Sequence, residues 1–190
     1  MVLDSKFIIT TVVTISLAFI GYLITYFNNL RLSQRKEKLE RVNSQLRELY
    51  GPLFALVNTS EIAWKSFRSV YRPSGAYFNG IEQPSEKELE AWRLWMINVF
   101  MPTNERMYEL ILNKSDLLIE NEIPQCLLLL CAHVSAYKTV KVRWENNDYS
   151  IHTSIINFPA SELRNYANKS FKMLKICQNQ LLGDENKGLV

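Results

Sequence analysis

The first long stretch without a charged residue is almost wholly apolar. It runs from Phe7 to Phe27, 21 residues, and reads FIITTVVTISLAFIGYLITYF. At a rise of about 1.5 Å per residue, this length spans the roughly 30 Å hydrocarbon layer of a bilayer. A secretory signal has a shorter apolar core, about 7 to 15 residues, and ends in a small-residue cleavage site that the stretch lacks. The pattern therefore predicts a transmembrane anchor over residues 1–28.

A second pattern, with members spaced alternately by three and four, passes through the span and continues beyond it. Small residues in such a stripe let helix backbones approach closely in lipid. From Leu39 to Leu56 the members are aliphatic, as a coiled-coil seam in water requires. The pattern predicts parallel self-association, with a chance match of the two registers as the alternative. The polar and small members, which would pack between copies or line a pore in a large ring, are Thr11, Thr14, Ala18, Gly21, Thr25, Asn28 and Arg35.

Residues 29–50 are predicted to form a juxtamembrane helical stalk, and a Gly-Pro pair follows it directly. Pro52 lacks an amide hydrogen and clashes with the carbonyl of Glu48, so a kink or a restart of the helix is expected. The seam nevertheless continues in sequence through Leu53 and Leu56 to Ala63, Phe67 and Val70. We therefore expect a bend that joins the stalk to the core of a domain over residues 51–183.

The rest of the chain shows helical periods separated by turn-forming stretches. Ser85 and Glu88 have the spacing of a capping box, and an apolar stripe follows them. Residues 125–144 are apolar nearly all round, which predicts a helix at the centre of the domain. A last helix is expected from about Ala160 to Leu182, with residues 184–190 as a mobile tail. The predicted fold class is all-α, with an antiparallel bundle of four or five helices after the span.

Charge is concentrated beside the span. Residues 31–47 carry six basic and two acidic side chains, whereas residues 48–190 sum to minus one. The positive-inside bias therefore predicts a single-pass protein with its C-terminal domain in the cytoplasm. Anionic membrane lipid is an expected partner of the basic segment. Nucleic acid is not, because the domain lacks an overall basic footprint.

Little in the sequence indicates catalysis. The two histidines are His133 and His152, and no Ser-His-Asp order, phosphate-binding Gly-rich loop or metal-ligand spacing is present. His133 is expected to be a hydrogen-bonded core residue. His152 lies in the most polar stretch of the chain with Arg143 and Asn147, where a loop satisfied by its own side chains is the simplest reading. We predict a protein that is not an enzyme and that uses no metal and no cofactor.

Five segments carry a resemblance to known proteins: LRELYGPLFALV, AWRLWMINVFMPTNERM, SDLLIENEIP, CAHVSAYKTV and HTSIINFP. Together they resemble a widespread family of small bacterial single-span helical membrane proteins. More narrowly, they are similar to the membrane accessory protein of type VI-B CRISPR systems, which has a divergent HEPN-like domain and is regarded as an oligomeric pore. The resemblance implies the bacterial inner membrane, a homo-oligomer, and an RNA-targeting CRISPR effector system as a partner.

HEPN ribonucleases carry an arginine followed, after four to six residues, by a histidine. Eight residues separate Arg143 from His152 in this chain. The resemblance therefore implies at most a remnant of that site at Arg143, Asn147 and His152.

Three functional hypotheses follow. The first is an oligomeric inner-membrane effector, a pore that lowers membrane integrity in antiphage defence. The second is a membrane-tethered adaptor that holds a soluble partner. A membrane-bound ribonuclease is the least favoured. The sequence leaves open the copy number, the trigger and whether the span conducts.

Overall fold

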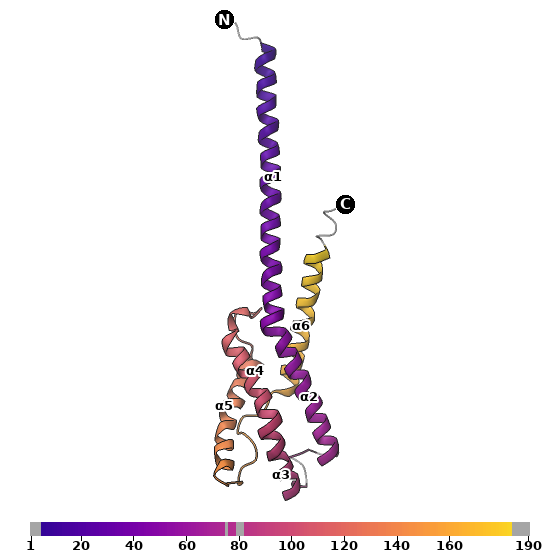
Figure 1. Ribbon diagram of the computed structural model, residues 1–190, viewed down its shortest axis with the longest axis vertical. Helices are drawn as coiled ribbons and strands as arrows, with labels where there is room; N and C mark the ends of the chain where they lie inside the picture. Colours follow the sequence, from indigo (N-terminus) through magenta and orange to yellow (C-terminus); the bar gives the residue numbers. More distant parts are fainter. Residues whose placement is uncertain (1–4, 75, 79–81, 184–190) are drawn as a thin grey trace.

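The computed structural model of the chain describes residues 5–74, 76–78 and 82–183 (Figure 1). These residues form helices and loops and contain no strand, which confirms the predicted all-α fold class. A long helical rod projects from one end of a bundle of shorter helices. The predicted mobile tail, residues 184–190, lies outside the described residues.

The rod is one helix of 67 residues, Ser5–Tyr71. It consists of α1 (Ser5–Gln45), a wide π-helical turn η1 (Leu46–Tyr50) and α2 (Gly51–Tyr71). Through Phe27 its apolar side chains are largely exposed, because none of the other residues that the structure describes packs against this segment. Among the described residues, this helix is the one whose length and composition would allow it to cross a membrane.

The wide turn η1 explains how the helix accepts a proline without ending. The amide of Gly51 donates to the carbonyl of Leu46, five residues back, instead of the usual four. The extra residue in the turn makes room for the ring of Pro52, which would otherwise clash with a carbonyl. Figure 1 shows the rod changing direction where α1 meets α2, so the expected bend is present and the helix does not restart.

A second proline is accommodated in the same way. The π-helical turn η2 (Met96–Phe100) joins α3 (Glu86–Trp95) to α4 (Met101–Asn113), and Pro102 follows it. Here the amide of Met101 donates to the carbonyl of Met96. The predicted capping box at the start of α3 is confirmed, since Ser85 and Glu88 each accept the other's backbone amide.

The extra residue in η1 also moves the buried face of the helix, and the predicted seam is only partly right beyond it. Val42 before the turn and Leu49 within it are buried as expected, and so are Leu53 and Phe67 beyond it. After it, Val57 is buried in place of the predicted Leu56, and Val70, the last predicted member, is 72% exposed. A period counted along the sequence assumes about 100° per residue, and a π-helical turn breaks that assumption.

The bundle consists of α2, the α3–η2–α4 helix, α5 (Gln125–Glu145) and α6 (Ala160–Gly183), with a short 3₁₀ turn η3 (Ser115–Leu117) after α4. In the described part of the chain this is a four-helix arrangement, within the predicted range of four or five. α2 packs against α6 and α4, and α5 packs against α4 and α6. The largest fully buried side chains belong to all of these helices and to η1: Leu49, Tyr50, Leu53, Phe67, Met107, Leu127, Leu130, Val134, Tyr137 and Leu163.

The expectation that α5 lies at the centre of the bundle is wrong. Figure 1 shows α5 at an edge, beside α4. Leu127 and Leu130 are fully buried, whereas Leu128 and Val142 are 45% and 54% exposed. The helix is apolar on more sides than the rest of the chain covers.

Candidate functional site

The small-residue stripe of the span is exposed along its length. The hydroxyls of Thr11, Thr14 and Thr25 donate to backbone carbonyls four residues earlier, at 2.8 Å, 2.8 Å and 2.9 Å. A Cβ added at Gly21 would meet nothing within 4 Å, and Ala18 and Asn28 are likewise exposed. The threonines are therefore satisfied within one helix, and the stripe offers an uninterrupted surface to a neighbouring helix.

Arg35, the last residue of the predicted stripe, binds the chain's own α6. Its Nε donates to the carbonyl of Leu181 at 3.1 Å, and its Nη2 donates to the same oxygen. This places the guanidinium at the C-terminal end of α6, where unpaired carbonyls carry partial negative charge. One turn earlier in α6, Gln178 donates to Asn43 at 2.6 Å. Arg35 thus secures the end of α6 against α1.

α6 also covers the aliphatic seam that was expected to join copies of the chain. α6 packs along α1, η1 and α2, and Val42, Leu46, Leu49 and Leu53 are all buried in the single chain. The hydrophobic surface of the stalk is therefore used within one molecule, and the part of the predicted stripe left open is the part inside the span.

The predicted remnant site does not come together. Arg143 forms an ion pair with Asp148 at 2.8 Å, and Asn147 has a left-handed backbone with φ of 59° and accepts the hydroxyl of Tyr149. No hydrogen bond or ion pair joins Arg143, Asn147 and His152 in the described part of the chain. Asp148 also accepts the amide and hydroxyl of Ser150, so the loop satisfies its own polar groups, as the alternative reading expected.

His152 contributes to the packing of its loop through its backbone carbonyl. Its backbone carbonyl accepts the indole N–H of Trp92 and the hydroxyl of Tyr137, both at 2.8 Å. Its imidazole has a lowered pKa, first because it is partly buried and second because Arg93 lies near it. His152 therefore ties the loop after α5 to two aromatic side chains of the bundle.

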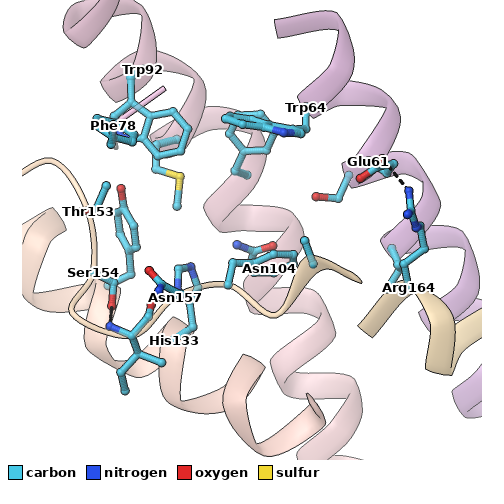
Figure 2. A pocket seen from close by; sticks show the side chains of 18 residues that line it. Glu61, Trp64, Phe78, Trp92, Asn104, His133, Thr153, Ser154, Asn157 and Arg164 are labelled. Atoms are coloured by element: carbon cyan, nitrogen blue, oxygen red, sulfur yellow. Dashed lines mark hydrogen bonds and ion pairs between the residues drawn. The ribbon is translucent and has the colours of Figure 1, made fainter. Parts of the chain in front are cut away.

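These two aromatic side chains form part of the wall of a cavity of about 400 Å³ (Figure 2). Its size lies in the range of small-molecule sites, about 300–1,000 Å³. α2, α3, η2, α4, α5, α6 and the loop between α5 and α6 all contribute to it. In Figure 2, Trp92, Phe78 and Trp64 lie along one side, His133 and Asn104 lie opposite, and the pair Glu61–Arg164 lies at one end. Ten of the eighteen lining residues are aromatic or otherwise apolar, and the other eight carry polar or charged side chains: Ser60, Glu61, Asn104, His133, Thr153, Ser154, Asn157 and Arg164.

Three buried polar side chains line this cavity: His133, Asn104 and Ser154, whose hydroxyl oxygen accepts the amide of Ile156 at 3.1 Å. His133, 6% exposed, makes a 2.6 Å hydrogen bond through Nδ1 to the carbonyl of Ile156, which confirms its predicted role as a hydrogen-bonded core residue. Burial lowers the pKa of its imidazole. The carbonyl can only accept, so Nδ1 carries the proton and Nε2 of the neutral ring is an acceptor. Asn104 is 3% exposed, and its Oδ1 is buried without a hydrogen-bond partner.

Acidification is expected to destabilise the domain through His133. The unfolded imidazole titrates near its ordinary pKa of 6.5, and the folded one below it. Stability is therefore complete above pH 6.5 and falls as the pH drops through 6.5 toward the folded pKa, by at most about 1.4 kcal/mol per pH unit. The check is the free energy of unfolding between pH 5 and 8. His133→Asn, whose amide can still donate to Ile156, should flatten the curve, and an unchanged slope would contradict the assignment.

Asn104 could have been recognised in the sequence as a candidate site residue, because it is a polar residue within an apolar stripe. Asn104 lies in phase with Phe100, Met107 and Ile111, the apolar stripe of its helix, and all four are buried. A polar residue at a core position of an amphipathic helix needs a partner, because burying an unpaired amide costs free energy.

Comparison of the sequence and structure with models of protein families, with curated proteins and with solved structures finds no match. Within the described residues, no group of three or more His, Cys, Asp or Glu side chains could hold a metal ion.

Proposed function

We propose that the chain is a single-span effector of the bacterial inner membrane whose copies associate through their spans. In this proposal the helical domain lies in the cytoplasm, as the basic residues beside the span favour. The assembly forms a pore that lowers membrane integrity. The resemblance of the chain to the membrane accessory protein of type VI-B CRISPR systems favours a role in CRISPR-associated antiphage defence.

The observation that carries the proposal is the continuity of the helix from Ser5 to Tyr71. Its apolar half has the length of a membrane span, and its other half supplies core residues of the domain. At the junction, Leu49, Tyr50 and Leu53 are fully buried. A change in the packing of the bundle is therefore passed to the span through one helix, with no flexible linker between them.

The wide turn η1 is held to the bundle by polar contacts as well. The hydroxyl of Tyr50 accepts the amide of Ile119 at 3.0 Å and lies 3.0 Å from the hydroxyl of Tyr166. Lys114 forms a 2.8 Å ion pair with Glu48, and hydrogen bonds from Lys114 and Arg47 lower the pKa of that carboxyl to about 2. These contacts fix the direction in which the span leaves the domain.

Leakage from vesicles tests the proposal. In liposomes containing anionic lipid, the purified chain should release an encapsulated dye. Gly21→Leu should reduce leakage about tenfold or more and shift the mass in detergent toward that of the monomer, because a large side chain blocks close helix approach. Val12→Leu, on the opposite side of the helix, is the matched control and should change neither. Intact vesicles at full oligomer loading would count against the pore.

The adaptor is the second candidate, and the exposed apolar side of α5 favours it. Leu128, Leu129 and Val142 remain exposed in the described structure and could pack against a soluble partner. An adaptor would retain its partner in a pull-down while leaving vesicles intact. A ribonuclease has less support, since Arg143 is paired with Asp148.

A further inference from the structure

We infer that the cavity between α2, α4, α5 and the loop after α5 binds an uncharged, planar aromatic molecule that donates a hydrogen bond. This inference goes beyond the proposed function and does not depend on it, because it concerns the helical domain and not the span.

The ligand is expected to carry a hydrogen-bond donor, because buried acceptor atoms of the cavity wall have no donor among the residues that the structure describes. Oδ1 of Asn104 has no partner, and Nε2 of His133 is an acceptor because Nδ1 carries the proton that binds Ile156. Trp92 and Tyr137, which could have supplied donors, already give theirs to the carbonyl of His152. Beside the Ser154 hydroxyl, whose oxygen accepts the amide of Ile156, the buried face of the cavity thus presents two acceptors whose complement is an N–H or O–H group on a ligand.

The ligand is expected to carry no net charge, because the charged side chains at the cavity are already paired with one another. Glu61 and Arg164 form a 2.8 Å ion pair at one end of it, and Glu61 also pairs with Lys65 at 3.1 Å. His133 is neutral at physiological pH, since burial lowers its pKa. A charged ligand would lose its hydration without gaining a free counter-charge, which is unfavourable.

The ligand is expected to be aromatic, because aromatic rings that hold one another in place line one side of the cavity. The rings of Trp64 and Trp92 are 6.0 Å apart at an interplanar angle of 80°, and Trp64 and Phe100 are 6.0 Å apart at 69°. Each ring is held by neighbouring rings in edge-to-face contacts, a favoured aromatic geometry. The walls are therefore preformed, and a flat ring can be bound at little cost in side-chain ordering.

Indole and benzofuran test the inference, because the two bicyclic rings have nearly the same shape and only indole carries an N–H. Binding is measured by calorimetry on the full chain in nanodiscs, with empty nanodiscs subtracted. Indole should bind about tenfold more tightly than benzofuran, the effect of one hydrogen bond to a buried acceptor.

Asn104→Leu should reduce that preference to less than twofold. The same variant should raise the Tm of the ligand-free domain by a few degrees, because it removes an unpaired buried oxygen. Asn98→Leu, the same change at an exposed position outside the cavity, is the control and should leave the preference intact. If Asn104→Leu still preferred indole over benzofuran, Oδ1 of Asn104 would not be the acceptor of the ligand's N–H group.

Nuclear magnetic resonance on the unchanged chain tests the same site without requiring that a variant fold. Intermolecular nuclear Overhauser contacts should join bound indole to the rings of His133 and Trp64. No binding of either probe at millimolar concentration, or equal binding of both, would show that the cavity holds solvent only.

Discussion

Replacing Gly51 with alanine will lower the free energy of unfolding of the domain by about 1–3 kcal/mol, the cost of overpacking a well-filled site. This loss of stability is opposite to the usual effect of the substitution, because alanine in an ordinary helix interior is about 1 kcal/mol more favourable than glycine. Gly51 has ordinary helical dihedral angles, φ of −66° and ψ of −53°. A Cβ at this position would nevertheless overlap the backbone carbonyl oxygen of Leu46.

The clash arises from the close approach of the Leu46 carbonyl, and not from proline or from a π-helical turn as such. Met101 occupies the equivalent place after η2 and carries a side chain, so a π-helical turn does not by itself require glycine. At η1 the Leu46 carbonyl approaches too closely for any side chain at residue 51, and a backbone atom cannot move aside cheaply. Gly183→Ala is the matched control, since its Cβ would meet nothing within 4 Å. Chemical denaturation in detergent checks both, and a stabilised Gly51→Ala would contradict this geometry.

Replacing Phe67 with alanine will cost about 3–5 kcal/mol, the range for deleting a buried aromatic side chain. Phe67 is fully buried. Its ring centroid lies 5.0–6.0 Å from those of six neighbours: Trp64, Tyr71, Tyr77, Trp92, Trp95 and Phe100. The side chain therefore joins α2 to the α3–η2 helix and to Tyr77 in the preceding loop, and its loss leaves a cavity that these rings cannot fill together.

Val70→Ala is the control for this prediction. Val70 lies on the same helix three residues later and is 72% exposed, so its truncation should change the free energy of unfolding by no more than about 0.5 kcal/mol. Urea denaturation followed by circular dichroism measures both variants. Equal losses for Phe67→Ala and Val70→Ala would show that the aromatic cluster does not hold the domain together.

Local features of the fold could be predicted from the sequence because their causes are local. The charge-free run to Phe27, the capping box at Ser85 and the proline-induced bend each depend on residues within a few positions of one another. Burial in α2 was predicted correctly at Leu53 and Phe67 but not at Val57 and Val70, since the residue count through η1 does not follow the α-helical period. The position of α5 was mispredicted because its apolar composition does not reveal how much of its surface the rest of the chain covers.

The candidate site was harder to predict, since it is built from residues far apart in sequence. His133 was predicted correctly as a core residue, but its acceptor role depends on Ile156 in a distant loop. Asn104 stands alone in an apolar stripe, and nothing near it in sequence indicates that Trp64 and Trp92 share its cavity. Likewise, the aliphatic seam of the stalk was predicted to join copies of the chain but is covered by α6, because a period cannot say whether a helical partner is another copy or part of the same chain.

The contact between Arg35 and α6 restricts the shape of any assembly. Counted at about 100° per residue, Thr14, Gly21 and Asn28 lie within about 60° of Arg35 around the axis of α1. The side of the rod that would face other copies in the bilayer is therefore close to the side on which α6 lies below it. Copies that meet along this side must leave the width of α6 between their rods outside the bilayer, so the assembly would be a cone, narrow where the spans meet and wide at the bundles.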